Sequence, residues 1–271
     1  MTKISILGCG WLGLPLAKAL IAKGNSVNGS TTSQDKLSIL KDARINPFLV
    51  TVESESVSEN ITVFLAESEI LIIDIPPKLR TVDPSSEKKV FVEKIKNLIP
   101  FIEKSTIQKV LFVSSTSVYG DDNGLVTEKT IPNPDTESGK QLLLAEKLLQ
   151  KNQNFETTIL RFGGLIGEDR HPVKFLAGKE NIENPDAPVN LIHQNDCIGI
   201  IEAIINQSNW NEVFNAVAPF HPIREEYYTQ KAAQMNLPLP NFSSEKSNIK
   251  KAISSKKIEN SLNYQFKLEN Y

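Results

Sequence analysis

The sequence predicts an α/β fold with a doubly wound parallel sheet and a smaller C-terminal lobe. Strand-like and helix-like segments alternate through roughly the first 160 of the 271 residues. The strand-like segments are short and apolar, as expected for strands that are buried on both faces of a sheet. Beyond them the alternation gives way to a loop-rich region. Alternation at this spacing implies right-handed βαβ crossovers and a parallel sheet.

The expected elements of the sheet follow one another from the N-terminus. Strand-like runs occupy residues 4–7, 26–30, 47–52, 70–75, 109–114 and 157–161. Apolar residues at helical spacing fill the intervals at 12–23, 34–43, 60–66, 90–105 and 138–150. The run ILIIDI at 70–75 illustrates a buried strand, because Asp74 is its only polar residue.

The C-terminal part of the chain is less regular. Residues 169–188 are polar and loop-rich, whereas 196–207 and 222–235 have helical patterns and 212–215 a short strand. The last residues include apolar and aromatic side chains, so we expect this tail to dock on the protein. We therefore predict a sheet domain at 1–165 and a smaller substrate lobe at 166–271, partly interleaved with it.

The composition is that of an ordinary soluble globular protein. Apolar residues make up 40% of the chain and charged residues 23%, and the net charge of −2 gives no footprint for nucleic acid or an anionic membrane. We find no apolar run that could span a bilayer and no signal peptide before the first strand. Cys9 and Cys197 build no disulfide framework. We expect a cytoplasmic location.

A glycine-rich turn, GCGWLG at residues 8–13, joins the first strand to the first helix. In a G-x-G-x-x-G turn, Gly8 allows the sharp bend, Gly10 lets the backbone approach a diphosphate, and Gly13 lets helix and strand pack closely. The helix N-terminus adds free N–H groups and a positive dipole end. The turn therefore predicts a Rossmann domain that binds a dinucleotide, and an ordinary βα turn is the alternative. The contacts expected on it are Gly8, Gly10, Trp11, Leu12 and Gly13.

Residues at the end of the second strand indicate which dinucleotide binds. An Asp or Glu there would bond the ribose 2′-hydroxyl of NAD, but the chain has Ser30, Thr31, Thr32 and Ser33, with Lys36 nearby. These hydroxyls tolerate a 2′-phosphate, so we favour NADP, with NAD as the alternative. The same residues could instead cap the next helix. Further cofactor contacts are expected at the ends of the fourth and fifth strands, at Ile75, Pro76 and Ser114.

Three later segments resemble motifs of the extended short-chain dehydrogenase/reductase superfamily, in its nucleotide-sugar epimerase/dehydratase branch. They are VSSTSVYG at 113–120, LRFGGLIG at 160–167 and NLIHQND at 190–196. The resemblance runs almost end to end and is nearest to a group of atypical members with a G-x-G-W-L-G turn and a DRHP segment like 169–172. It implies an NAD(P)-binding protein and a homodimer through the helices at 90–105 and 138–150.

The sequence departs from the superfamily at the catalytic helix. Family members use a Tyr and a Lys four residues apart, usually followed four residues later by a Glu. That Glu resembles Glu146, so counting back puts Leu142 at the Lys and Ser138 at the Tyr. Ser138 is a weaker acid than a phenol and has no ammonium beside it. We expect either a degenerate catalytic residue at Ser138 or a helix cap there.

Other candidate site residues follow from the same resemblance and from residue chemistry. Ser115 stands where the family places the hydroxyl that binds the reacting oxygen of the substrate, although it could instead satisfy local backbone groups. Arg170 and His171 begin the second lobe and are candidate substrate contacts, because an Arg can hold an anionic group bidentately. The alternative for Arg170 is an ordinary surface charge. The His and Cys spacing predicts no metal site.

The sequence is consistent with two functions. The first is an NAD(P)-binding oxidoreductase or epimerase-like protein with a degenerate active site, acting on a nucleotide sugar or a small carbonyl or hydroxyl compound. The second is a non-catalytic NAD(P)-binding redox sensor or regulatory protein. The missing Tyr and Lys favour the second, whereas the retained lobe with Arg170 and His171 favours the first, which we adopt.

Overall fold

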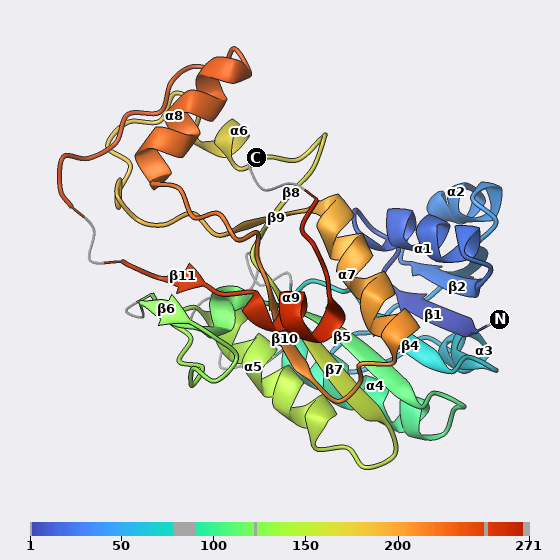
Figure 1. Cartoon of the computed structure of the whole chain (residues 1–271). Coiled ribbons are helices and arrows are strands. Elements are labelled where there is room, and N and C mark those ends of the chain that lie inside the picture. Colours follow the sequence, from blue (N-terminus) through green and yellow to red (C-terminus); the bar gives the residue numbers. More distant parts are fainter. Residues whose placement is uncertain (1, 78–89, 122–123, 247–248, 268–271) are drawn as a thin grey trace.

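The computed structural model describes residues 2–77, 90–121, 124–246 and 249–267. In these ranges the centre of the molecule is a seven-stranded sheet in the order β10-β7-β5-β4-β1-β2-β3, with every neighbouring pair parallel (Figure 1). This confirms the predicted fold class. The strands are β1 (Lys3–Leu7), β2 (Ser26–Thr31), β3 (Asn46–Leu49), β4 (Ile70–Ile73), β5 (Lys109–Ser115), β7 (Glu156–Phe162) and β10 (Val213–Ala216).

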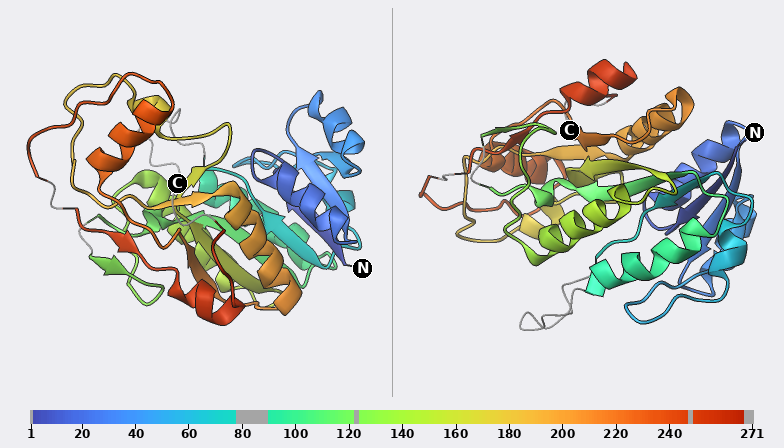
Figure 2. Two further views of the ribbon diagram at one scale, coloured as in Figure 1. Left: turned by 45° about the horizontal axis from the view of Figure 1, so that its top comes forward. Right: turned by 90° about the horizontal axis from the view of Figure 1, so that it is seen from below.

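Helices cover both faces of the sheet, as the alternating side chains of buried strands require. On one face Ile70 and Ile72 of β4 pack in a core with α1 (Gly13–Ala22), α2 (Lys36–Asp42), α7 (Gln194–Gln207) and α9 (Lys256–Leu262). On the other face Leu71 and Ile73 pack with α3 (Ile61–Leu65), α4 (Val90–Glu103) and α5 (Glu137–Gln150). Figure 2 shows α4 and α5 on one side of the sheet and α7 and α9 on the other.

The strand order reverses its direction at β1. The chain runs from β1 to β2 and β3 toward one edge, and from β4 to β5, β7 and β10 toward the other. The loops that leave β1 and β4 therefore diverge at the carboxyl ends of two adjacent strands. In open α/β sheets ligands bind in the crevice at such a switch point.

A smaller lobe stands beside the carboxyl ends of the later strands, at the upper left of Figure 1. Its core holds Val173 from α6 (Val173–Leu176), with Tyr227 and Tyr228 from α8 (Arg224–Gln234). The short parallel pair of β8 (Gly164–Ile166) and β9 (Leu191–His193) contributes Ile166 and Leu191 to this core. A second short parallel pair, β6 (Leu125–Val126) with β11 (Ala252–Ile253), packs Val126 and Ile253 against the core of the sheet domain. Since α7, β10 and α9 belong to the sheet domain, the chain passes between the two parts more than once.

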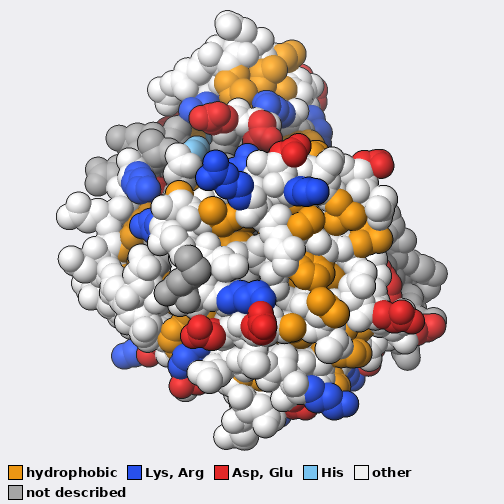
Figure 3. Space-filling view, turned by 90° about the vertical axis from the view of Figure 1, so that its right-hand side faces the viewer, with side chains coloured by type: hydrophobic (Ala, Val, Ile, Leu, Met, Phe, Trp, Pro, Cys, Tyr) orange, Lys and Arg blue, Asp and Glu red, His pale blue; other side chains and the backbone are white. Residues whose placement is uncertain are grey.

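The surface around α1 and α2 carries charges of both signs. Figure 3 shows acidic and basic side chains interspersed with scattered apolar ones on this face. Among the described residues, no helix has both the length and the apolar character that crossing a bilayer would require.

Candidate functional site

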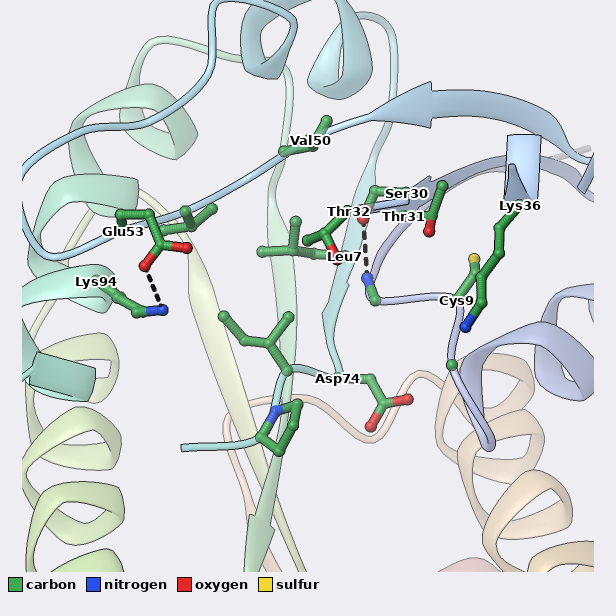
Figure 4. Close-up of a pocket in the computed structure, with 15 residues that line it drawn as sticks. Leu7, Cys9, Ser30, Thr31, Thr32, Lys36, Val50, Glu53, Asp74 and Lys94 are labelled. Carbon is green, nitrogen blue, oxygen red and sulfur yellow. Dashed lines mark hydrogen bonds and ion pairs between the residues drawn. The ribbon is translucent and has the colours of Figure 1, made fainter. Parts of the chain in front are cut away.

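A cavity of about 280 Å³ opens at the switch point, between the ends of β1, β2 and β4 (Figure 4). Five segments line it: the glycine turn, the end of β2 with the start of α2, the chain after β3, the end of β4, and α4. Its lining residues are Leu7, Gly8, Cys9, Gly10, Ser30, Thr31, Thr32, Lys36, Val50, Val52, Glu53, Asp74, Ile75, Pro76 and Lys94.

A side chain at each of the three glycines of the turn would have a different structural effect. Gly8 has a φ of +108°, and a Cβ there would clash with the carbonyl of Asp74. A Cβ on Gly13 would clash with the carbonyl of Gly8, so α1 can approach the turn only with a glycine at its start. A Cβ on Gly10 would meet nothing within 4 Å. Packing therefore requires Gly8 and Gly13, whereas Gly10 keeps the cavity side of the turn open.

The end of β2 is fastened to the turn. The backbone N–H of Gly8 donates to the Ser30 hydroxyl at 2.9 Å, and the N–H of Cys9 donates to the Ser30 carbonyl at 2.8 Å. The Thr31 hydroxyl accepts from the N–H of Ser33 at 3.1 Å. These two hydroxyls thus hold the backbone in place. Thr32 is exposed on the cavity wall beyond them.

The far wall of the cavity is apolar and ends in an ion pair. Val50 and Val52 follow β3, and Ile75 follows β4, so a flat apolar ligand would lie between aliphatic side chains. The Lys94 ammonium lies 2.7 Å from the Glu53 carboxylate (Figure 4). This pair balances its own charge. Lys36, on the opposite wall, is exposed and extends toward the glycine turn (Figure 4).

Asp74 places a carboxyl group directly beside the glycine turn. It follows β4, and one of its carboxylate oxygens lies 3.3 Å from where a Gly13 Cβ would stand. Burial raises its pKa to about 7, although a hydrogen bond from the Gly13 N–H partly opposes this shift. Burial and the neighbouring Asp74 charge raise the pKa of the Cys9 thiol to about 12, so this thiol stays neutral.

Trp11 leaves the cavity and joins the turn to the second lobe. Its indole Nε1–H donates to Asp169 at 2.8 Å, and the Arg170 guanidinium carbon lies 5.0 Å from the ring centroid. The Gln194 side chain donates to the Trp11 carbonyl at 2.7 Å. Arg170 therefore sits on the glycine turn itself. Leu12 is buried in the core below the turn.

The α5 helix lacks the groups of a dehydrogenase catalytic helix. Thr136 is its N-cap and accepts from the N–H of Gly139 at 3.1 Å, so the expectation that Ser138 caps the helix is wrong. Ser138 lies in the first turn instead. Leu142 is 4% exposed, and its position holds a buried aliphatic side chain in place of an ammonium. The Ser115 hydroxyl accepts from the N–H of Ser117 at 3.1 Å, in agreement with a local backbone role.

A buried polar network lies beneath this helix. Arg161 pairs with Glu146 through Nη2 at 2.6 Å and Nε at 3.1 Å, and Ser114 donates to Glu146 at 2.5 Å. The Tyr119 hydroxyl accepts from Arg161 at 2.6 Å and donates to Asn215 at 3.0 Å. The Ser114 hydroxyl thus points into the core, away from the place expected for a cofactor contact. Burial raises the pKa of Tyr119, which keeps this phenol neutral.

His171 is buried in the second lobe. Its Nδ1 accepts from the N–H of Val173 at 3.1 Å, so Nε2 carries the proton and donates to the Tyr227 hydroxyl at 2.9 Å. Burial lowers the pKa of His171 to about 4, and Lys231 and Lys174 add to the shift. The expected substrate contact His171 is thus a neutral, 8% exposed imidazole that packs in the lobe against Tyr227. Within the described ranges no three His, Cys, Asp or Glu residues are grouped as metal ligands.

Comparison with known proteins places the chain in a family. Protein YeeZ of Escherichia coli (strain K12) is 35% identical over 268 residues, which cover 98% of this chain and 96% of YeeZ. The chain belongs to the YeeZ family. Its sequence matches no family model.

Solved structures share the fold of this YeeZ-family chain. A putative NAD-dependent epimerase/dehydratase from Methylobacillus flagellatus is 25% identical, with a TM-score of 0.77, over 100% of this chain and 94% of that one. A UDP-glucuronic acid 4-epimerase from Bacillus cereus, in complex with NAD, is 17% identical, with a TM-score of 0.81, over 98% and 92%. These matches confirm the fold, and the first agrees with the resemblance to NAD-dependent epimerase/dehydratase proteins.

Several residues of the cavity were not expected from the sequence. Val50, Val52, Glu53 and Lys94 come from a loop and a helix that carry no recognisable motif. Asp74 gave a usable signal, because it is the one polar residue in an otherwise apolar strand segment. A lone carboxylate at the carboxyl end of a central parallel strand marks a ligand crevice more strongly than a polar residue elsewhere.

Proposed function

We propose that this protein binds a nicotinamide dinucleotide in the switch-point cavity. The observation that carries the proposal is the glycine turn, whose open Gly10 side faces that cavity at the N-terminus of α1. Such a turn presents N–H groups and a positive helix end to a diphosphate. The apolar wall of Val50, Val52 and Ile75 suits an adenine ring. The epimerase of the same fold was solved in complex with NAD.

We propose NADP(H) as the preferred dinucleotide, with NAD(H) as the alternative. The described cavity-lining residues at the end of β2 and the start of α2 include no acidic side chain, and Asp35, the N-cap of α2, is not among them. An acidic side chain at this place would be needed to accept from the 2′-hydroxyl of NAD. The exposed Thr32 hydroxyl and the Lys36 ammonium can instead donate to a 2′-phosphate. Glu53 does not repel that phosphate strongly, because Lys94 neutralises it.

The activity we propose is an oxidoreductase or epimerase-like hydride transfer on a nucleotide sugar or a small carbonyl or hydroxyl compound. Ser115 can still donate its hydroxyl proton to the reacting oxygen while it accepts from Ser117. With a buried Leu142 in place of an ammonium, the proton for that oxygen comes from water or from the second lobe. General acid catalysis is typically worth about 10²- to 10⁴-fold, so turnover is slow.

The same observation supports a second candidate, a redox sensor that binds NADP(H) without turnover. Leu142 fills the position of the missing cation, and Ser138 offers no phenol. Stopped-flow fluorescence of bound NADPH against a panel of sugar nucleotides and aldehydes separates the two candidates. Oxidation of NADPH by any of these compounds supports the enzyme, whereas tight binding without oxidation supports the sensor.

Calorimetric titration with NADPH, NADP⁺, NADH and NAD⁺ tests the binding proposal. We expect the phosphorylated coenzymes to bind more tightly. Lys36→Ala should weaken the binding of NADPH by about 10- to 100-fold, which is the contribution of one charge-assisted hydrogen bond. The binding of NADH should weaken much less. Lys41→Ala, on the same helix but outside the cavity, is the matched control. Absence of heat with all four coenzymes from folded protein would refute the proposal.

We also propose a homodimer through α4 and α5, which lie side by side on one face of the sheet (Figure 2). Sedimentation velocity of the purified protein tests it. A species of twice the chain mass of 30.2 kDa is expected, and a monomer at micromolar concentration would contradict it.

A further inference from the structure

Asp74 shares the cavity with the part of the turn that faces a ligand. Its backbone N–H donates to the Leu7 carbonyl at 2.9 Å, so the residue continues the pairing of β4 with β1 and cannot swing away as a loop would. Its carboxyl group extends toward the turn (Figure 4). Both Asp74 and Gly10 line the same cavity. A diphosphate on the turn would therefore stand close to this carboxyl group.

The protonation state of Asp74 determines whether that proximity opposes or supports binding. An ionised carboxylate and a diphosphate repel each other, and the repulsion is strong where burial weakens solvent screening. A protonated carboxyl group removes it and adds an O–H donor to the site. Asp74 is only partly exposed, and burial already raises its pKa to about 7 before any ligand is present. A bound diphosphate raises that pKa further, because a nearby like charge disfavours the ionised form.

The other ionisable groups near Asp74 do not change this conclusion. Cys9 from the turn and Cys197 from α7 are buried thiols whose pKa values burial raises, so both stay neutral. Lys94 from α4 is paired with Glu53 from the segment after β3. Lys36 from α2 is a further cation on the cavity wall, and Arg170 from the second lobe is stacked on Trp11, which does not line the cavity. Lysine and arginine side chains attract a diphosphate by charge-assisted hydrogen bonds.

We infer that Asp74 takes up a proton when a dinucleotide binds, so that the affinity of the cavity falls as the pH rises. This inference rests on the proposed function, and it assigns to Asp74 a role in positioning the cofactor. The proton comes from solvent and returns there on release. By linkage, the slope of log Kd against pH equals the number of protons taken up.

Calorimetry of NADPH binding at pH 7, 8 and 9, in buffers of different ionisation enthalpy, measures that number directly. This range lies above the second phosphate pKa of about 6, so the 2′-phosphate contributes little. For the wild-type protein, with a free pKa of about 7, we expect uptake of about half a proton at pH 7 and about one at pH 8. The Kd should then rise about fivefold from pH 7 to 8 and about ninefold from pH 8 to 9. This measurement on the wild type shows whether a proton is taken up, and the variant below shows whether Asp74 takes it up.

Asp74→Asn provides the second arm, since Asn keeps the shape and cannot ionise. We expect it to bind NADPH with a nearly constant Kd from pH 7 to 9, and more tightly than the wild type at pH 9. Glu53→Gln is the matched control, because it removes a carboxylate from the same cavity and should keep the pH slope. Binding without proton uptake, or an equal slope in Asp74→Asn, overturns the inference and leaves the proposed function standing. Absence of binding heat with every coenzyme at every pH would instead refute the proposed function.

Discussion

Replacing Glu146 by Gln should destabilise the fold by about 3 to 5 kcal/mol, because it leaves a buried Arg161 without its counter-charge. The two side chains are 1% and 6% exposed and form a two-pronged contact at 2.6 and 3.1 Å. Glu146 holds the pKa of Arg161 above its usual range, although burial opposes the charged form. A guanidinium is too basic to lose its proton at neutral pH, so Arg161 keeps its charge in the variant, where only a neutral amide faces it.

Urea unfolding at pH 7 measures this loss as a free energy, and thermal unfolding should show a shift of roughly 2 to 4 °C per kcal/mol. Glu156→Gln is the control, because its pair with Lys109 is 2.6 Å long but 52% and 28% exposed. Such a surface pair is worth about 0.2 to 1 kcal/mol. Removing both buried charges, with Glu146→Leu and Arg161→Met, should recover part of the stability. If Glu146→Gln costs no more than Glu156→Gln, the buried pair does not stabilise the fold as argued.

The remaining predictions concern pH and the glycine turn. Because the native pKa of His171 is about 4, its contribution to stability is complete above pH 6.5 and is lost as the pH falls toward 4, by about 1.4 kcal/mol per unit. Urea midpoints at pH 7 and 4.5 should show a smaller decline in His171→Asn, and an unchanged decline would contradict the shift. Gly13→Ala should lower the thermal midpoint because its Cβ clashes with Gly8, whereas Gly10→Ala should keep the midpoint and weaken NADPH. Equal midpoints for the two variants would refute this distinction.

The sheet domain could be predicted because its signals are local. Each predicted strand is a short apolar run and each predicted helix carries an apolar stripe, and the structure has an element at each of these places. The run at 47–52 forms a strand only at Asn46–Leu49, and α9 in the C-terminal tail was not predicted. The small pairs β6–β11 and β8–β9 could not be predicted, since two or three residues are too few for a period. Their strands form because partners distant in the sequence meet them.

The site divides in the same way. The glycine turn follows from a motif, but the orientation of Trp11 depends on Asp169, which is 158 residues away. The N-cap of α5 could not be identified from the sequence, because Thr136 and Ser138 both have hydroxyls near the first turn. The backbone decides between them: Thr136 is extended, with φ of −98° and ψ of 149°, as an N-cap must be. Such a dihedral angle is set by packing, which no short segment encodes.

The contacts of Trp11 with Asp169 and Arg170 couple the position of the glycine turn to that of the second lobe. A shift of the indole breaks its bond to Asp169 and removes the surface on which Arg170 lies. We therefore expect that a ligand bound in the cavity changes the position of the second lobe through the Trp11 ring. Trp11 is one of two tryptophans in the chain, so intrinsic tryptophan fluorescence should report this change.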